Sequence, residues 1–173
     1  DLSWDEFQNI LPEVEIHERT APEDVPARCA GASIVLTNKT KLPAEVIQSL
    51  PDLRFIGVLA TGFDVVDAKA ARACGIPVSN VPAYSTFSVV QMVFSFILNW
   101  TNGIAHHAAR VRDGAWASSR DFAFWDFPLH ELEGKTLGIV GFGRIGQQVG
   151  KIASAFGMKV SAVVRSPKSV DYP

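Results

Sequence analysis

Three glycines at a fixed spacing are the residues of this sequence best suited to chemistry. They lie in the run Gly141–Gly146, which has the pattern G-x-G-x-x-G. In such a run Gly141 permits a tight turn, Gly143 lets the backbone approach a diphosphate, and Gly146 allows a helix to pack closely on a strand. The phosphates then meet the positive end of the helix dipole. The run predicts a dinucleotide site, and a glycine turn in an ordinary α/β protein is the alternative.

The segments on either side of this glycine run supply the setting that the pattern requires. A largely apolar run, Thr136–Val140, precedes it and predicts a buried strand. Apolar residues then recur at helical spacing from Ile145 to Phe156, Gly157 ends the helix, and Val160–Val164 predicts the next strand. A strand, a glycine turn, a helix and a second strand in this order indicate a βαβ unit that carries the phosphate site.

The end of the second strand predicts which dinucleotide is bound. An NAD site usually has an acidic residue about 20 positions after the glycines, where it accepts hydrogen bonds from the ribose hydroxyls. No acidic residue stands between Glu133 and Asp171. The strand instead leads into Arg165, Ser166 and Lys168, which offer a guanidinium, a hydroxyl and an ammonium where a 2′-phosphate would lie. We expect NADP to be favoured over NAD, the alternative being that both cations are solvated loop charges.

Composition and charge describe a globular chain and disfavour several classes of partner. The 173 residues are 47% hydrophobic and carry a formal net charge of -2, which gives no basic field for nucleic acid or an anionic membrane surface. The most apolar window, Phe87–Trp100, is shorter than the roughly 20 residues that span a membrane, and it predicts a helix buried in protein. Cys29 and Cys74 predict neither a disulfide framework nor a metal site, so a reducing cytoplasm fits best.

Short strands and helices that alternate along the chain predict an α/β fold with a mostly parallel sheet. Before the glycine run, the sequence predicts strands at 34–37, 55–59 and 76–80, and helices at 42–50 and near 67–74. A long apolar helix is then predicted from about Ser85 to His106 or beyond. The pattern of a strand followed by a helix thus occurs in two sets, with this long helix between them.

Several separated motifs stand in the chain in a characteristic order. They are Gly57–Asp67, Gly75–Pro82, Ser88–Gln91 and Leu137–Gly146. Together they resemble the D-isomer-specific 2-hydroxyacid dehydrogenase family. The segment Phe124–Lys135 is most similar to its D-glycerate dehydrogenase branch, the hydroxypyruvate and glyoxylate reductases. The likeness covers nearly the whole chain, and these motifs in order are far more specific than the glycine run alone.

The resemblance implies a two-domain enzyme, usually a homodimer, that reduces a small 2-keto acid to the D-2-hydroxy acid with hydride from NAD(P)H. Residues 1–84 would form a flavodoxin-like substrate domain, with or without its first strand. Residues 85–173 would form the interdomain helix and the N-terminal half of a Rossmann domain. The expected fold class is therefore α/β, a flavodoxin-like domain followed by an incomplete doubly wound parallel sheet that binds a dinucleotide.

The resemblance also assigns site residues. One loop of the family holds the substrate carboxylate with its backbone amides, and it is matched here by Ala60, Thr61 and Gly62. The side of this loop that carries Thr61 also touches the cofactor in the family. Oriented N–H groups at a strand end suit a carboxylate, although a plain glycine turn is the alternative. Arg144 and Ile145 match the pair that line the diphosphate. The expected cofactor-binding residues are Thr61, Gly141, Phe142, Gly143, Arg144, Ile145, Gly146, Arg165 and Ser166, with no metal site.

The family's catalytic arginine, acid and histidine all follow the second Rossmann strand, so none of them is assigned within this chain. A dinucleotide fold has two βαβαβ halves, and only one βαβ unit follows Lys135. We therefore expect the chain to be truncated before the catalytic residues at Pro173, and inactive by itself. His106 and His107 precede the glycine run, and a surface or interdomain role is favoured for both.

Rival functions and the role of one aromatic segment stay open at this point. An NAD(H)-sensing, corepressor-like interaction protein would use the same scaffold, because a fold does not fix a function. A formate or phosphite dehydrogenase is a third possibility. Phe122, Phe124, Trp125 and Phe127 would either cap a substrate cleft or reach across a dimer, or else form interface or linker core.

Overall fold

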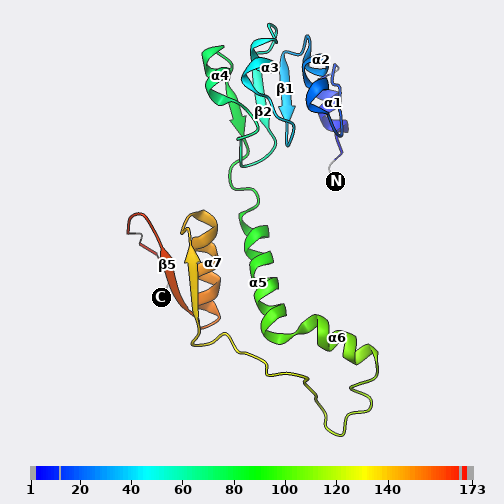
Figure 1. The fold of residues 1–173 in the computed structure, drawn as a ribbon, viewed down its shortest axis with the longest axis vertical. Helices are drawn as coiled ribbons and strands as arrows, with labels where there is room; N and C mark the ends of the chain where they lie inside the picture. The colour runs from blue at the N-terminus through cyan, green and yellow to red at the C-terminus, as the bar shows by residue number, and fades with distance from the viewer. Residues whose placement is uncertain (1–2, 12, 168, 171–173) are drawn as a thin grey trace. The chain divides into compact units, whose positions relative to one another are not determined.

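The computed structural model describes residues 3–11, 13–167, 169 and 170. The chain, drawn as a ribbon in Figure 1, divides into two compact units, Asp1–Pro82 (unit 1) and Ala83–Pro173 (unit 2). Each unit has its own apolar core. The expected α/β class with parallel strands is confirmed. The roles of substrate domain and cofactor domain stay predictions for these two units.

Unit 1 is built on three parallel strands in the order β1-β2-β3. Ile34 of β1 lies opposite Phe55 of β2, and Ile56 of β2 lies opposite Val78 of β3. Helices connect the strands, as the alternation in the sequence predicted. The elements of unit 1 are α1 (Asp5–Ile10), η1 (Pro22–Asp24), α2 (Val25–Cys29), β1 (Ile34–Thr37), α3 (Ala44–Gln48), β2 (Phe55–Val58), α4 (Ala68–Ala73) and β3 (Val78–Asn80).

The central strand β2 carries the core of unit 1. Ile56 is 0% exposed and Val58 is 1% exposed. Between them, a Cβ atom on Gly57 would stand 2.5 Å from Cδ2 of Leu36, so the neighbouring side chain occupies the space that a larger residue would need. Further core residues come from the helices and connections around the sheet, among them Leu42, Val46, Ile47, Val66, Ala70 and Ala71.

Helix α4 begins at a capping carboxylate and is followed by a glycine. The Asp67 side chain accepts hydrogen bonds from the backbone N–H groups of Lys69 (3.1 Å) and Ala70 (2.9 Å), which satisfies two donors of the first turn. Gly75 follows the helix with φ +72°, a left-handed conformation that suits glycine. Pro77 then precedes β3, an edge strand of this three-stranded sheet, where a missing N–H is tolerated.

The described part of unit 2 contains three helices, of which α5 is the most apolar, and a parallel pair of strands. Thr136 of β4 lies opposite Lys159 of β5, and α7 connects these strands and packs on both of them and on α5. The core contains Val90, Phe94, Leu132, Val149, Ala153 and Met158. The elements of unit 2 are α5 (Thr86–Asn102), α6 (Ile104–Arg112), β4 (Thr136–Val140), α7 (Arg144–Ala155) and β5 (Lys159–Val163).

The prediction of one helix from Ser85 through His106 is wrong, because the helix breaks at Gly103. Gly103 has φ +57°, which is left-handed, and α5 and α6 meet there at 58°. A Cβ atom at this position would overlap the ring of Phe127. The left-handed glycine thus separates the two helices, and the Phe127 ring packs against it at the break.

Helix α5 is buried on one face only, so the prediction of a helix buried in protein holds for that face alone. Val90 and Phe94 are in the core, whereas Met92, Phe96 and Trp100, spaced four residues apart, are exposed. The apolar residues of the window therefore occupy two faces. Among the described residues, no single helix has the length and hydropathy to cross a membrane, and the bent pair α5–α6 meets that test on length and composition alone.

Candidate functional sites

The glycine run has the local geometry that the sequence predicted for it. Gly141 directly follows β4 with φ +92°, and Gly143 is the extended N-cap residue of α7. A Cβ atom on Gly146 would stand 2.5 Å from the carbonyl oxygen of Gly141. Helix α7 thus approaches the turn so closely that only glycine fits at its third position.

The space beside the first two glycines is open. A Cβ atom added to Gly141 or Gly143 would meet no heavy atom within 4 Å. In the described structure α7 has no side-chain cap at Gly143 and no acidic residue in its first turn. Its first N–H groups and the positive end of its dipole are therefore available to an anion, and these residues fit a diphosphate.

The other residues of the run differ in what they can contribute to such a site. Phe142 is only 8% exposed, so its side chain belongs to the packed interior and only its backbone can face a ligand. The Gln147 side chain donates a hydrogen bond to the Phe142 carbonyl (3.3 Å), which fixes the turn further. The side chains of Arg144 and Ile145 are exposed on the first turn of α7.

Arg165 and Ser166 leave the sheet at the same edge as the glycine run. Val140 and Val163 are partners in the parallel register, and the Gly141 N–H donates to the Val163 carbonyl at 3.4 Å. Because parallel strands end at one edge, the segment after β5 emerges next to the segment after β4. Arg165 and Ser166 are both exposed there, and Lys168 lies outside the described residues.

The predicted carboxylate loop, Ala60–Gly62, follows β2 in unit 1 and is held by the end of β3. The Val81 N–H donates to the Ala60 carbonyl (3.1 Å), the Thr61 hydroxyl donates to the Val81 carbonyl (3.1 Å), and the Asn80 side-chain amide donates to the Thr61 carbonyl (2.7 Å). The sequence interpretation did not include Asn80 or Val81 among the site residues. Their position at the carboxyl end of the neighbouring parallel strand, Asn80 as its last residue and Val81 directly after it, is the signal that could have identified them.

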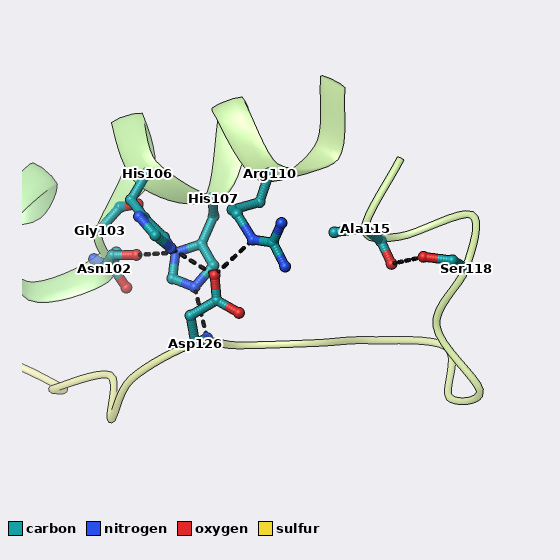
Figure 2. A network of polar contacts seen from close by, with 8 residues as sticks. All are labelled: Asn102, Gly103, His106, His107, Arg110, Ala115, Ser118 and Asp126. Atoms are coloured by element: carbon teal, nitrogen blue, oxygen red, sulfur yellow. Dashed lines mark hydrogen bonds and ion pairs between the residues drawn. The ribbon is translucent and has the colours of Figure 1, made fainter. Parts of the chain in front are cut away.

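A second polar cluster, absent from the sequence-based assignments, lies in unit 2 around Asp126 (Figure 2). The Asp126 Oδ2 atom contacts Nε2 of His106 at 2.6 Å and accepts a hydrogen bond from Nε of Arg110 at 2.9 Å. These hydrogen bonds, from His106 first and then from Arg110, hold the pKa of the Asp126 carboxyl below its usual range. The cluster ties the segment after α6 back to that helix.

His107 completes this cluster through both of its ring nitrogens. Its Nδ1 lies 3.0 Å from the carbonyl oxygen of Gly103, to which it can only donate, and its Nε2 accepts from the Asp126 N–H at 3.4 Å. The rings of Phe124 and Phe127 contact His107, with centroids 6.0 and 4.9 Å away. Phe124 and Phe127 therefore anchor their segment, while Phe122 and Trp125 make no such ring contact within the described part of the chain and are 92% and 67% exposed, against 36% for Phe127.

Comparison with known proteins places these motifs in one family of enzymes. A family model described as "D-isomer specific 2-hydroxyacid dehydrogenase, catalytic domain" matches residues 2–164. The hydroxypyruvate reductase of Blautia hydrogenotrophica is 48% identical over 165 residues, which are 94% of this chain and 51% of that protein. The glycerate dehydrogenase of Methylorubrum extorquens is 40% identical over 163 residues, covering 94% of this chain and 52% of that protein.

A solved structure is similar to this chain in fold over nearly its whole length. The TT0316 protein from Thermus thermophilus matches with a TM-score of 0.80 and 34% sequence identity, over 97% of this chain and 55% of that chain. The chain spans about half the length of the curated relatives that it matches.

Proposed function

The chain belongs to the D-isomer-specific 2-hydroxyacid dehydrogenase family, and from this premise we propose that the protein transfers hydride between NAD(P)H and a small 2-keto acid. The family binds NAD(P). Reduction of hydroxypyruvate to D-glycerate is the reaction we favour, because hydroxypyruvate reductase and glycerate dehydrogenase are the names of two relatives. Reduction of glyoxylate to glycolate is the second.

The observation that carries this proposal is the geometry of the glycine run. The close approach of Gly146 to Gly141 brings the start of α7 against the turn, and the space beside Gly143 is open. We propose that the backbone N–H groups of Gly141–Gly146 hold the diphosphate, with Arg144 and Ile145 at its side. When bound, the nicotinamide supplies the hydride.

We propose that the loop Ala60–Gly62 binds the carboxylate of the 2-keto acid. Support comes from its place at the carboxyl end of β2 and from the bonds that Asn80 and Val81 make to it, which hold its backbone in one conformation. A preorganised pair of backbone donors suits a carboxylate, since no reorganisation is needed when the anion arrives. We also propose that the side of this loop that carries Thr61 touches the cofactor.

We propose a preference for NADP over NAD, supported by the cation and the hydroxyl of Arg165 and Ser166 at the edge where the glycine run lies. In the full-length protein, Arg165→Asp should lower the ratio of kcat/KM for NADPH to that for NADH by about 10- to 100-fold, since hydrogen bonds to charged groups are lost. Arg54→Asp makes the same charge change at an exposed position of unit 1 and should leave the ratio unchanged. Unaltered discrimination in Arg165→Asp would reject the preference.

We also propose a cytoplasmic homodimer without affinity for nucleic acid or membranes. The exposed apolar stripe of Met92, Phe96 and Trp100 on α5 supports association between copies, and the exposed free thiol of Cys74 suits a reducing compartment. Sedimentation of the full-length protein should give a dimer, and Phe96→Asp should shift it toward monomer. A monomeric wild type would contradict this part of the proposal.

One assay tests the proposed reaction. Full-length protein is given NADPH or NADH with hydroxypyruvate, glyoxylate or pyruvate, and cofactor oxidation is followed by absorbance. We expect turnover of hydroxypyruvate and glyoxylate, faster with NADPH. Binding of the dinucleotide without turnover of any 2-keto acid would favour the sensor alternative. Reduction of NADP+ or NAD+ with formate or phosphite, measured in a parallel assay, would favour the formate or phosphite dehydrogenase alternative.

A further inference from the structure

The end of β3 places an amide side chain against the loop that follows β2. Asn80 is the last residue of β3, its side chain is partly buried, and its Nδ2 donates to the Thr61 carbonyl at 2.7 Å. One residue further on, the Val81 N–H donates to the Ala60 carbonyl at 3.1 Å. Two consecutive carbonyl groups of the loop therefore point toward the same short segment, Asn80–Val81.

These two bonds determine where the next N–H groups point. A peptide unit is planar and trans here, so its C=O and its N–H point in opposite directions. The Ala60 carbonyl shares its peptide unit with the Thr61 N–H, and the Thr61 carbonyl shares its unit with the Gly62 N–H. Because both carbonyls point toward β3, both N–H groups point away from it.

The two N–H groups are available to a ligand. In the part of the chain that the structure describes, neither the Thr61 nor the Gly62 N–H donates to a protein group, and both residues are exposed. The Asp64 carboxylate lies close by, with Oδ1 3.1 Å from where a Cβ atom on Gly62 would stand. That charge opposes an incoming carboxylate, so binding depends on both donors being aimed at the anion.

We propose that Asn80 is a positioning residue that aims the Gly62 N–H at the substrate carboxylate. It acts through the Thr61 carbonyl and touches neither substrate nor cofactor. This role rests on the proposed function of the loop Ala60–Gly62. Without the Asn80 amide, the Thr61–Gly62 peptide unit can rotate, and the Gly62 donor no longer meets the anion.

A set of three variants separates a hydrogen-bonding role from a packing role. Asn80→Ala removes both the donor and the bulk, Asn80→Leu keeps bulk without a donor, and Asn80→His restores an N–H donor on a ring of similar reach. The matched control is Asn102→Ala, which removes another side-chain amide bond to a backbone carbonyl, that of Leu98 at 3.1 Å, in unit 2. Thermal unfolding of each variant is recorded alongside.

The full-length protein is assayed with hydroxypyruvate and NADPH, and with oxamate as a carboxylate inhibitor that is not reduced. We expect the KM for hydroxypyruvate and the Ki for oxamate to rise about 10- to 100-fold in Asn80→Ala and Asn80→Leu, the range for a lost hydrogen bond to a charged group. Asn80→His and Asn102→Ala should stay within about threefold of wild type. The Kd for NADPH should change less than about twofold throughout.

The outcomes distinguish failure of this inference from failure of the proposed function. If wild type reduces hydroxypyruvate but Asn80→Leu retains wild-type KM and Ki, the amide only fills space and the positioning role is overturned. Equal losses of NADPH and oxamate affinity would also overturn it, because they indicate general damage. If wild type itself neither reduces the keto acid nor binds oxamate, the proposed function fails. If Asn80→Ala does not fold, the comparison of Asn80→Leu with Asn80→His decides alone.

Discussion

The sheets of the two units contain similar apolar strands in different surroundings. In unit 1, β2 has a strand on each side, and Ile56 and Val58 are 0% and 1% exposed. In unit 2, β4 pairs with β5 alone among the described strands, and Val140 and Val163 are 89% and 67% exposed. The sequence predicted a buried strand in both places. An apolar run therefore identifies a strand, whereas the burial of each face depends on elements that the run does not specify.

The candidate loops that follow these strands are also held in different ways. The loop Ala60–Gly62 is fixed by a side chain, because the Asn80 amide binds the Thr61 carbonyl. The glycine run is fixed by the absence of a side chain, because α7 can approach Gly141 only where Gly146 has no Cβ. Substitutions should consequently act through lost hydrogen bonds in unit 1 and through steric overlap in unit 2.

The largest effect is expected for Gly146→Ala. Its Cβ would stand 2.5 Å from a backbone oxygen, which cannot move aside as a flexible side chain could. We expect the free energy of unfolding to fall by about 1–3 kcal/mol, because the start of α7 is displaced. For the same reason the Kd for NADPH should rise at least about tenfold. Chemical denaturation and fluorescence titration of the full-length protein measure both. Gly138→Ala is the control, since a Cβ there meets nothing within 4 Å, and a similar loss in both variants would contradict the steric account.

An intermediate effect tests the contrast between the two sheets directly. Val58→Ala removes two buried methyl groups from β2 and should cost about 2 kcal/mol of unfolding free energy. Val140→Ala makes the same change at the exposed end of β4 and should stay within about 0.5 kcal/mol. Denaturant titration with separate probes for the two units measures both. Equal losses of unfolding free energy in the two variants would contradict this contrast, because they would mean that Val140 is as buried in the full-length protein as Val58 is in unit 1.

The smallest effect concerns the polar cluster of unit 2. The pKa of Asp126 is lowered in the folded protein, so the contribution of its carboxylate is present above the pKa of the unfolded chain and is lost as the pH falls through the folded value. We expect the protection factors of amides in the segment 122–130, which compare observed with intrinsic exchange rates, to fall at acidic pH. Asp126→Asn should show the lower protection already at neutral pH. Asp121→Asn removes an exposed carboxyl from the same segment as a control, and an unchanged pH profile in Asp126→Asn would contradict the account.

Local signals in the sequence predicted the features that depend on local geometry. The helix predicted near 67–74 is α4, and the spacing of the glycine run placed a turn before α7. Features that depend on distant partners were not predicted. They include the packing of the Phe127 ring against Gly103 at the break between α5 and α6, and the bond from Asn80 to Thr61, which exists only because β2 and β3 are paired in register.

The cluster around Asp126 illustrates the same limit. His106 and Arg110 lie one helical turn apart on α6, and their partner comes from a segment without regular structure. The sequence around His106 and His107 contains no signal that identifies Asp126 as a partner, so only a surface or interdomain role was expected for the two histidines. The observed contacts give His106 and His107 a structural task, and no described contact tests a catalytic one.

The most direct test of the central claim is a competition for the dinucleotide site of the full-length protein. NADPH binding is followed by fluorescence and challenged with ADP-ribose, which contains the diphosphate but no nicotinamide, and with adenosine, which contains neither. A diphosphate held by the backbone of Gly141–Gly146 predicts that ADP-ribose displaces NADPH and adenosine does so far more weakly. Absence of NADPH binding, or equal displacement by adenosine and ADP-ribose, would contradict it.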